Sequence, residues 1–239
     1  MTPEEAAAAT TAGISTIASH FMMDGATYKR GAELGFSGLD FYAGGRGGVL
    51  GDVDADVVTA AFYYFEPSMV RANWEAAVAV MAPAKAAEEW ARCSHAWGEA
   101  HLPDGVDAAR LAELAGRCVA SATAAGAPVF AGWRRLALPE SPKALALHHL
   151  NGLRELRGAL HGGATLAAGL RPVEALLVKT PHMAPLFGWS DPLPDVTDRK
   201  ALWDEAEAGT NRAMAHVFAD LSDGERQELS DLIAAANKA

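Results

Sequence analysis

The chain has 239 residues, half of them hydrophobic, and a formal net charge of −10. This composition predicts a soluble globular protein with enough apolar residues for a sizeable core, and it disfavours long disordered segments. Because an acidic surface repels phosphate on average, the charge also disfavours non-specific nucleic-acid binding.

The chain shows no signal for secretion or for a membrane helix. Its N-terminal segment is acidic where a secretory signal would be basic, and no apolar stretch reaches the ~20 residues of a membrane span. The two cysteines, Cys93 and Cys118, have no metal-binding or redox spacing. We therefore expect a cytoplasmic protein without a membrane partner.

Alanine is frequent and strand signals are nearly absent, so the sequence predicts helices almost throughout. Thr2 is a suitable N-cap and Pro3 a suitable first residue for a helix that runs to about Met23. A short second helix, from Tyr28, is expected to end at Gly35.

The segment after the second helix is the least regular part of the chain. Six glycines fall between Gly35 and Gly48, which predicts a structural hairpin or wing. The alternative is an anion cradle, in which backbone N–H groups and the Arg46 guanidinium converge on a ligand. The segment lacks the lysine and the serine or threonine of a phosphate loop.

Proline and aspartate residues then mark the boundaries of four predicted helices, which cover residues 55–65, 67–81, 83–101 and 106–125. The first of these is expected to stop at Glu66, because the following proline disfavours helical geometry there. Tryptophans that recur on the helical faces, and both cysteines, are predicted to be core residues.

The second half of the chain continues this helical pattern. A helix that starts at Ser141-Pro142 is predicted to loosen at Gly162-Gly163, and a shorter helix covers residues 172–178. Four prolines then mark a long loop that we expect to act as a lid or an interaction segment. The last two helices cover residues 198–221 and 222–237, the second with a capping box.

Three cationic residues are candidates for a functional site. Arg154, Arg157 and His161 are spaced by three and four, so a helix would place them on one face. Burying them without partners would be costly, so they must meet solvent, carboxylates of residues 204–207, or an anionic ligand. Glu155 is expected to point elsewhere.

His182, in the proline-rich loop, is the most suitable second ligand if His161 were to hold a metal or haem. The chain has no recognised metal-binding spacing, so no metal site is predicted and the cofactor is unknown. His161 is also the candidate acid or base, although a lone histidine is more often structural.

A pocket could also form around the segment EAGTNR. Glu207 and Thr210 share a helical face there, and Arg134 could complete the lining. Trp189 in the proline-rich loop could close over a ligand, or it could simply pin the loop to the core.

Three groups of segments resemble the actinobacterial helix-turn-helix-like family of the SalK/EvbL type. They are FYAGGRGGVLGDVDADVVTAAFYYFEPSMVRANWEAA, the pair AGWRRLALP and LRELRGALHGGA, and WDEAEAGTNRAMAHVFADL. The resemblance implies a largely helical, winged-helix-like fold whose biochemical role is mostly unassigned. The family's central polar motif is incomplete, since Leu156 and Ala159 replace two of its members.

The closing segment LSDGERQELSDLI is also similar to the last helices of MarR-type winged-helix regulators. In those proteins the helices form the dimer interface, which implies a homodimer through the C-terminal helices. Likeness of fold does not by itself imply DNA binding.

Together these observations predict a mainly α, winged-helix or helix-turn-helix-like bundle with at most a minor β-hairpin. We expect one compact unit over residues 1–239, resembling two fused halves of about 1–104 and 105–239. The leading functional hypothesis is a small-molecule-binding protein, or a tailoring enzyme, for an anionic or carbonyl-bearing ligand. Its arginines would hold the anion and His161 would move a proton. The alternative is a dimeric DNA-binding transcriptional regulator.

Overall fold

The computed structural model describes residues 1–237, which form α-helices and two short 3-10 helices without a strand among them. In chain order these helices are α1 (Pro3–Met23), α2 (Gly25–Glu33), α3 (Leu39–Gly47), η1 (Gly48–Leu50), α4 (Ala55–Phe62), α5 (Pro67–Val80), α6 (Pro83–His101), α7 (Ala108–Ser121), α8 (Pro128–Trp133), α9 (Pro142–Ala167), α10 (Pro172–Lys179), η2 (Pro181–Met183), α11 (Lys200–Phe218) and α12 (Asp223–Ala236). The predicted mainly α fold class is confirmed. None of these helices is both long and apolar enough to cross a membrane.

Local capping signals explain many of the helix boundaries. The side chain of Thr2 accepts a hydrogen bond from the backbone N–H of Glu5, and the Glu5 carboxylate accepts one from the N–H of Thr2. Ser222 and Glu225 form the same reciprocal arrangement before α12. Such capping satisfies backbone N–H groups that a helix start otherwise leaves unpaired.

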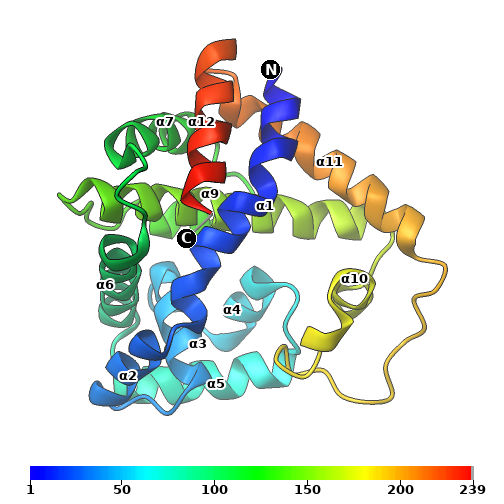
Figure 1. The fold of residues 1–239 in the computed structure, drawn as a ribbon. Helices are drawn as coiled ribbons and strands as arrows, with labels where there is room; N and C mark the ends of the chain where they lie inside the picture. Colours follow the sequence, from blue (N-terminus) through cyan, green and yellow to red (C-terminus); the bar gives the residue numbers. More distant parts are fainter. Residues whose placement is uncertain (238–239) are drawn as a thin grey trace.

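The long helix α9 crosses the middle of the molecule (Figure 1). Helices α1, α6, α7 and α11 pack against it, and α12 packs against α1 and α7. One face of α9 buries a stripe of leucines at helical spacing: Leu147, Leu150, Leu153 and Leu156. This stripe is the centre of the largest core cluster, which includes residues of α1, α7, α11 and α12.

A second core cluster joins α3 and α6. Trp90 is fully buried there between the rings of Phe21 and Phe41, with ring centroids 5.1 and 5.2 Å away. Trp74 and Trp133 are also buried, as the sequence predicts, and both cysteines are buried thiols.

The predicted hairpin or wing at the glycine-rich segment is wrong, because the chain forms α3 and η1 there. Gly35 and Gly38 form the turn before α3, but the later glycines of the segment serve close packing. A Cβ at Gly45 would lie 2.6 Å from the Cβ of Trp90, and one at Gly48 would overlap the carbonyl oxygen of Pro83. Arg46 therefore extends from a helix and not from a glycine loop, which was the geometry of the alternative anion cradle.

Two helix ends also differ from expectation. Helix α4 ends at Phe62 rather than near Glu66, because Tyr63 adopts a positive φ of 49° and turns the chain. Helix α9 continues through Gly162 and Gly163 to Ala167 instead of loosening. A Cβ at Gly162 would lie 3.0 Å from the ring of Tyr63, so this glycine allows the chain after α4 to approach α9 closely.

The proline-rich segment packs against α10 through its own small apolar cluster. Val173, Leu176 and Leu177 of α10 join Ala184, and side chains that include Phe187 and Trp189 pack against them. The segment thus has side-chain contacts of its own although it contains only one short 3-10 helix.

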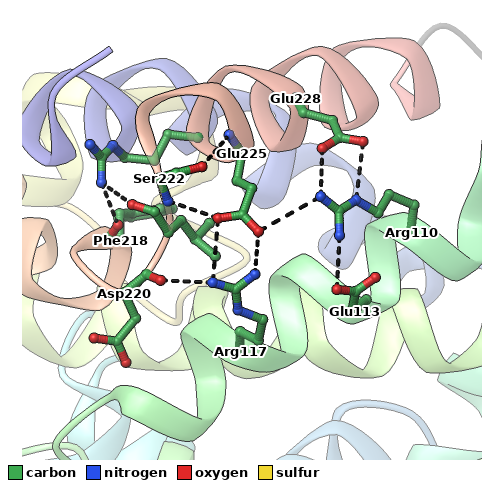
Figure 2. Close-up of polar contacts among 10 residues, drawn as sticks. Arg110, Glu113, Arg117, Phe218, Asp220, Ser222, Glu225 and Glu228 are labelled. Atoms are coloured by element: carbon green, nitrogen blue, oxygen red, sulfur yellow. Dashed lines mark hydrogen bonds and ion pairs between the residues drawn. The ribbon is translucent and has the colours of Figure 1, made fainter.

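Ion pairs hold α12 beside α7 (Figure 2). Arg110 forms a two-pronged contact with Glu228, with N···O distances of 3.1 and 2.8 Å, and Arg117 pairs with Glu225. Because these side chains are partly exposed, they fix the position of α12 more than they stabilise the fold. A homodimer through the C-terminal helices remains a prediction.

Candidate ligand-binding site

A cavity of about 210 Å³ lies between α1, the α3–α4 region, α9 and the segment near Phe187. Four of the predicted site residues line it: Arg46, Arg154, Arg157 and His161. Aromatic side chains form the rest of the wall: Tyr42, Phe62, Tyr63, Tyr64, Phe65 and Phe187. The cavity thus combines cationic groups with an aromatic wall.

Arg46 reaches the cavity from α3 and pairs with Glu155 of α9. Its Nη2 lies 2.7 Å from Glu155 Oε2 and its Nε lies 3.0 Å from Oε1. Arg154 Nη1 donates to the same Oε1 at 2.8 Å. The Arg46 side chain is 13% exposed and that of Glu155 only 1%.

Glu155 was expected to point away from the arginines, and the structure corrects this. Its backbone position does differ from that of Arg154 by about 100° around the helix. The long arginine side chain nevertheless folds alongside the carboxylate, which is fixed by Arg46 from another helix. The correct partner therefore lies 109 positions away in the sequence, beyond the reach of helical spacing.

The buried pair is held in its charged form. Burial raises the pKa of Glu155, but the positive charges of Arg46 and Arg154 outweigh this effect and bring it below its ordinary value. Burial likewise opposes the charge on Arg46, but Glu155 and Tyr42 raise the Arg46 pKa overall. The Arg46 guanidinium also lies over the Phe62 ring, 4.4 Å from its centroid.

Arg157 meets a carboxylate of α11, as one alternative in the sequence analysis predicts. Its Nη2 lies 2.7 Å from Glu207 Oε2, and its Nε donates to Thr11 Oγ1 at 3.0 Å. Three guanidinium groups therefore share two carboxylates, Glu155 and Glu207, around the cavity. With His161 neutral, these groups leave one positive charge without a paired carboxylate.

His161 sits at the inner end of this cluster. Its Nδ1 lies 2.9 Å from Thr210 Oγ1, and the Trp203 ring packs edge-on against the imidazole at a centroid distance of 4.8 Å. Burial lowers the pKa of His161 to about 4, although the Glu207 carboxylate opposes the shift and Arg157 adds to it. The imidazole is therefore neutral at pH 7.

The other five predicted site residues do not line this cavity. Glu207 and Thr210 lie directly behind it, bonded to Arg157 and His161, whereas Arg134, His182 and Trp189 lie elsewhere. Arg134 caps the end of α7 by donating to the carbonyl of Ala122 at 2.8 Å, and it lines a different groove between α7 and α9. It therefore does not join Arg154, Arg157 and His161, and it does not complete a pocket with Glu207 and Thr210.

His182 and Trp189 belong to the proline-rich segment. His182 is exposed in η2, and no cluster of three or more metal-binding side chains occurs in residues 1–237. Trp189 donates from Nε1 to the carbonyl of Tyr64 at 2.8 Å. It therefore pins the segment beside the aromatic wall, which is the structural alternative that the sequence left open.

Sequence reasoning missed the aromatic wall. Its core is the run Phe62-Tyr63-Tyr64-Phe65, which looks like the end of a buried helix. The turn at Tyr63 instead brings Tyr63 and Tyr64 to α9, where Tyr63 Oη lies 2.7 Å from Thr165 Oγ1. Phe62 and Phe65 pack against Tyr42 of α3. The four consecutive aromatic residues were the one available signal.

Residues 1–237 form an all-helical fold without strands that holds a small cationic and aromatic cavity. Residues 7–239 match a family described as a helix-turn-helix family, and the chain belongs to that family. It matches no curated protein and no solved structure. The finer SalK/EvbL resemblance and the actinobacterial origin that it implies remain predictions.

Proposed function

We propose that this protein binds a small anionic molecule in the cavity beside α9. The observation that supports this most is the charge balance at the cavity wall, where three arginines share two carboxylates. A partly buried positive charge without a counter-charge is costly. An anionic ligand group supplies that counter-charge through charge-assisted hydrogen bonds.

The groups around the cavity have distinct roles in this proposal. Arg154 and Arg157 bind the anion, since both side chains line the cavity and each is more exposed than Arg46. Arg46 and Glu155 position Arg154, and Glu207 positions Arg157. If the bound molecule is also transformed, His161 is the group that accepts or donates a proton.

Family membership favours a second candidate, a DNA-binding transcriptional regulator. That function requires a basic surface that follows the phosphate backbone, whereas the chain carries ten more acidic than basic side chains. We therefore rank it second. Its signature is affinity for duplex DNA that falls steeply with salt concentration.

The test compares thermal unfolding with and without a panel of small carboxylates and phosphates. A ligand at about 100 times its Kd raises the Tm of a protein of this size by about 5–10 °C. The Arg154→Ala, Arg157→Ala double variant is expected to bind at least about tenfold more weakly, with its helical circular dichroism unchanged.

Arg71→Ala is the matched control, because Arg71 is exposed on α5 and pairs only with Asp56 and Glu75 among the described residues. It should bind like the unmodified protein. Unchanged affinity in the double variant would overturn the proposal. So would a protein that ignores every small anion and binds duplex DNA with a steep salt dependence.

A further inference from the structure

The hydrogen bonds around His161 define which of its nitrogens carries the proton. Thr210 Oγ1 lies 2.7 Å from the carbonyl oxygen of Ala206, which can only accept. We assign the single hydroxyl proton of Thr210 to that bond, so that its oxygen accepts from His161 Nδ1 at 2.9 Å. Nδ1 carries the proton, and Nε2 presents a free lone pair.

That lone pair has no hydrogen-bond donor among residues 1–237. His161 Nε2 is buried and without a hydrogen-bond partner, although the residue lines the cavity. Its neighbour Glu207 Oε1, at 3.4 Å, is itself an acceptor while the imidazole is neutral. A buried acceptor without a donor is costly, which makes this nitrogen a site for a donor from outside the chain.

A second polar group at the cavity wall, the hydroxyl of Tyr64, also lacks a hydrogen-bond partner among the described residues. The Tyr64 Oη atom is buried. Its ring lies 6.2 Å from the imidazole of His161, centroid to centroid, so both groups serve the same end of the cavity. Burial raises the pKa of Tyr64, which keeps the phenol protonated and able to donate.

Size and lining restrict the ligand further. A cavity of about 150 Å³ is known to accept benzene, so about 210 Å³ accommodates one ring with small substituents. The wall of phenylalanine and tyrosine rings favours a flat aromatic partner through stacked or edge-on contacts.

Building on the proposed function, we propose that the ligand is a single-ring aromatic carboxylate that carries a hydroxyl group. The carboxylate binds Arg154 and Arg157, the ring lies against the aromatic wall, and the hydroxyl donates to His161 Nε2. Tyr64 Oη then donates to the same hydroxyl oxygen. This arrangement satisfies both incomplete groups and the unpaired positive charge.

The experiment measures by calorimetry the binding of benzoate and of the ortho, meta and para isomers of hydroxybenzoate. We expect at least one isomer to bind about tenfold more tightly than benzoate, because a site with a buried acceptor discriminates against a ligand that lacks the donor. In His161→Phe the difference between that isomer and benzoate should disappear. The control His182→Phe, at an exposed histidine, should keep it.

Nitrogen NMR of the unmodified protein provides a second test that needs no variant. It should show the proton on Nδ1 of His161 before binding, and a shift of Nε2 towards the hydrogen-bonded form when the preferred isomer is added. A proton on Nε2 in the free protein would overturn the inference.

The calorimetric outcomes separate the two proposals. If no isomer exceeds benzoate, or if another small anion binds through the two arginines while all benzoates fail, the ligand class is wrong and the proposed function stands. If no small anion binds at all, both are overturned.

Discussion

Glu155 is the residue on which the cationic cluster depends. It accepts hydrogen bonds from two arginines and is almost fully buried, so its removal leaves the Arg46 guanidinium without a carboxylate in a largely buried position. Breaking a buried pair from one side costs far more than the pair itself contributes, because an uncompensated charge remains.

We therefore expect Glu155→Ala to lower the free energy of unfolding by about 3–5 kcal/mol in urea denaturation at pH 7. The control Glu75→Ala, at an exposed partner of Arg71, should change it by no more than about 0.5 kcal/mol. Replacing both partners, with Arg46→Met and Glu155→Leu, should recover much of the loss. Equal effects of Glu155→Ala and Glu75→Ala would contradict this role.

The buried histidines give the protein a defined response to acid. Burial lowers the pKa of His161 and of His95 to about 4 and that of His148 to about 3, from the ordinary value of 6.5. Between pH 6.5 and 4 the unfolded chain therefore binds protons that the folded protein does not. The free energy of unfolding must fall as the pH falls through this window.

Carboxylates with lowered pKa values, such as Glu155, titrate below their ordinary 4.5, so the range from pH 6.5 to 5 reports mainly on the histidines. Denaturation at several pH values should show the decline, and it should be smaller in His161→Phe. Proton NMR should find His161 still neutral at pH 5. Titration of His161 near 6.5 would show that its imidazole is solvated rather than buried.

At the scale of elements, capping signals and proline positions were readable from the sequence. Thr2-Pro3 and Ser222 mark helix starts by local chemistry alone, and α6 begins and ends at the predicted residues. The glycine-rich helix α3 was not readable, since glycine normally disfavours helix and here is required by contacts with α5 and α6.

In the candidate site, too, the sequence predicts what local spacing determines and not what tertiary packing determines. Helical spacing brought Arg154, Arg157 and His161 to one face, as the structure has them around one cavity. The pairing of Arg46 with Glu155 depends on the packing of α3 against the rest of the molecule. No local pattern carries that information.

Replacement by alanine is expected to destabilise the protein at one glycine and to stabilise it at another. Gly48→Ala would place a Cβ against the backbone carbonyl of Pro83, which cannot move without shifting the start of α6, so we expect a loss of about 1–3 kcal/mol. Gly163→Ala is on an exposed part of α9 with no atom near the new Cβ, and should gain about 0.5–1 kcal/mol.

Thermal and urea unfolding of both variants would check this pair. A neutral Gly48→Ala would mean that η1 and α6 are not packed as closely as described, and that the glycines of this segment serve a turn as the sequence suggests. A destabilising Gly163→Ala would argue against a continuous α9.

At the scale of the whole molecule, the protein combines a helix-turn-helix family scaffold with a formal charge of −10 and a small cationic cavity. The overall charge opposes a long polyanion such as DNA, whereas the cavity favours one small anion. The net negative charge acts at long range, whereas the arginines act only within the cavity. The positive charge is therefore concentrated at a local site rather than spread over an extended surface.

The most direct test of this account is native mass spectrometry, with an absorbance scan, of the protein purified from a bacterial host. We expect a small bound anion with an aromatic absorbance on the unmodified protein, and its loss from the Arg154→Ala, Arg157→Ala double variant. An empty protein that forms a salt-sensitive complex with duplex DNA would contradict it and would favour the regulator.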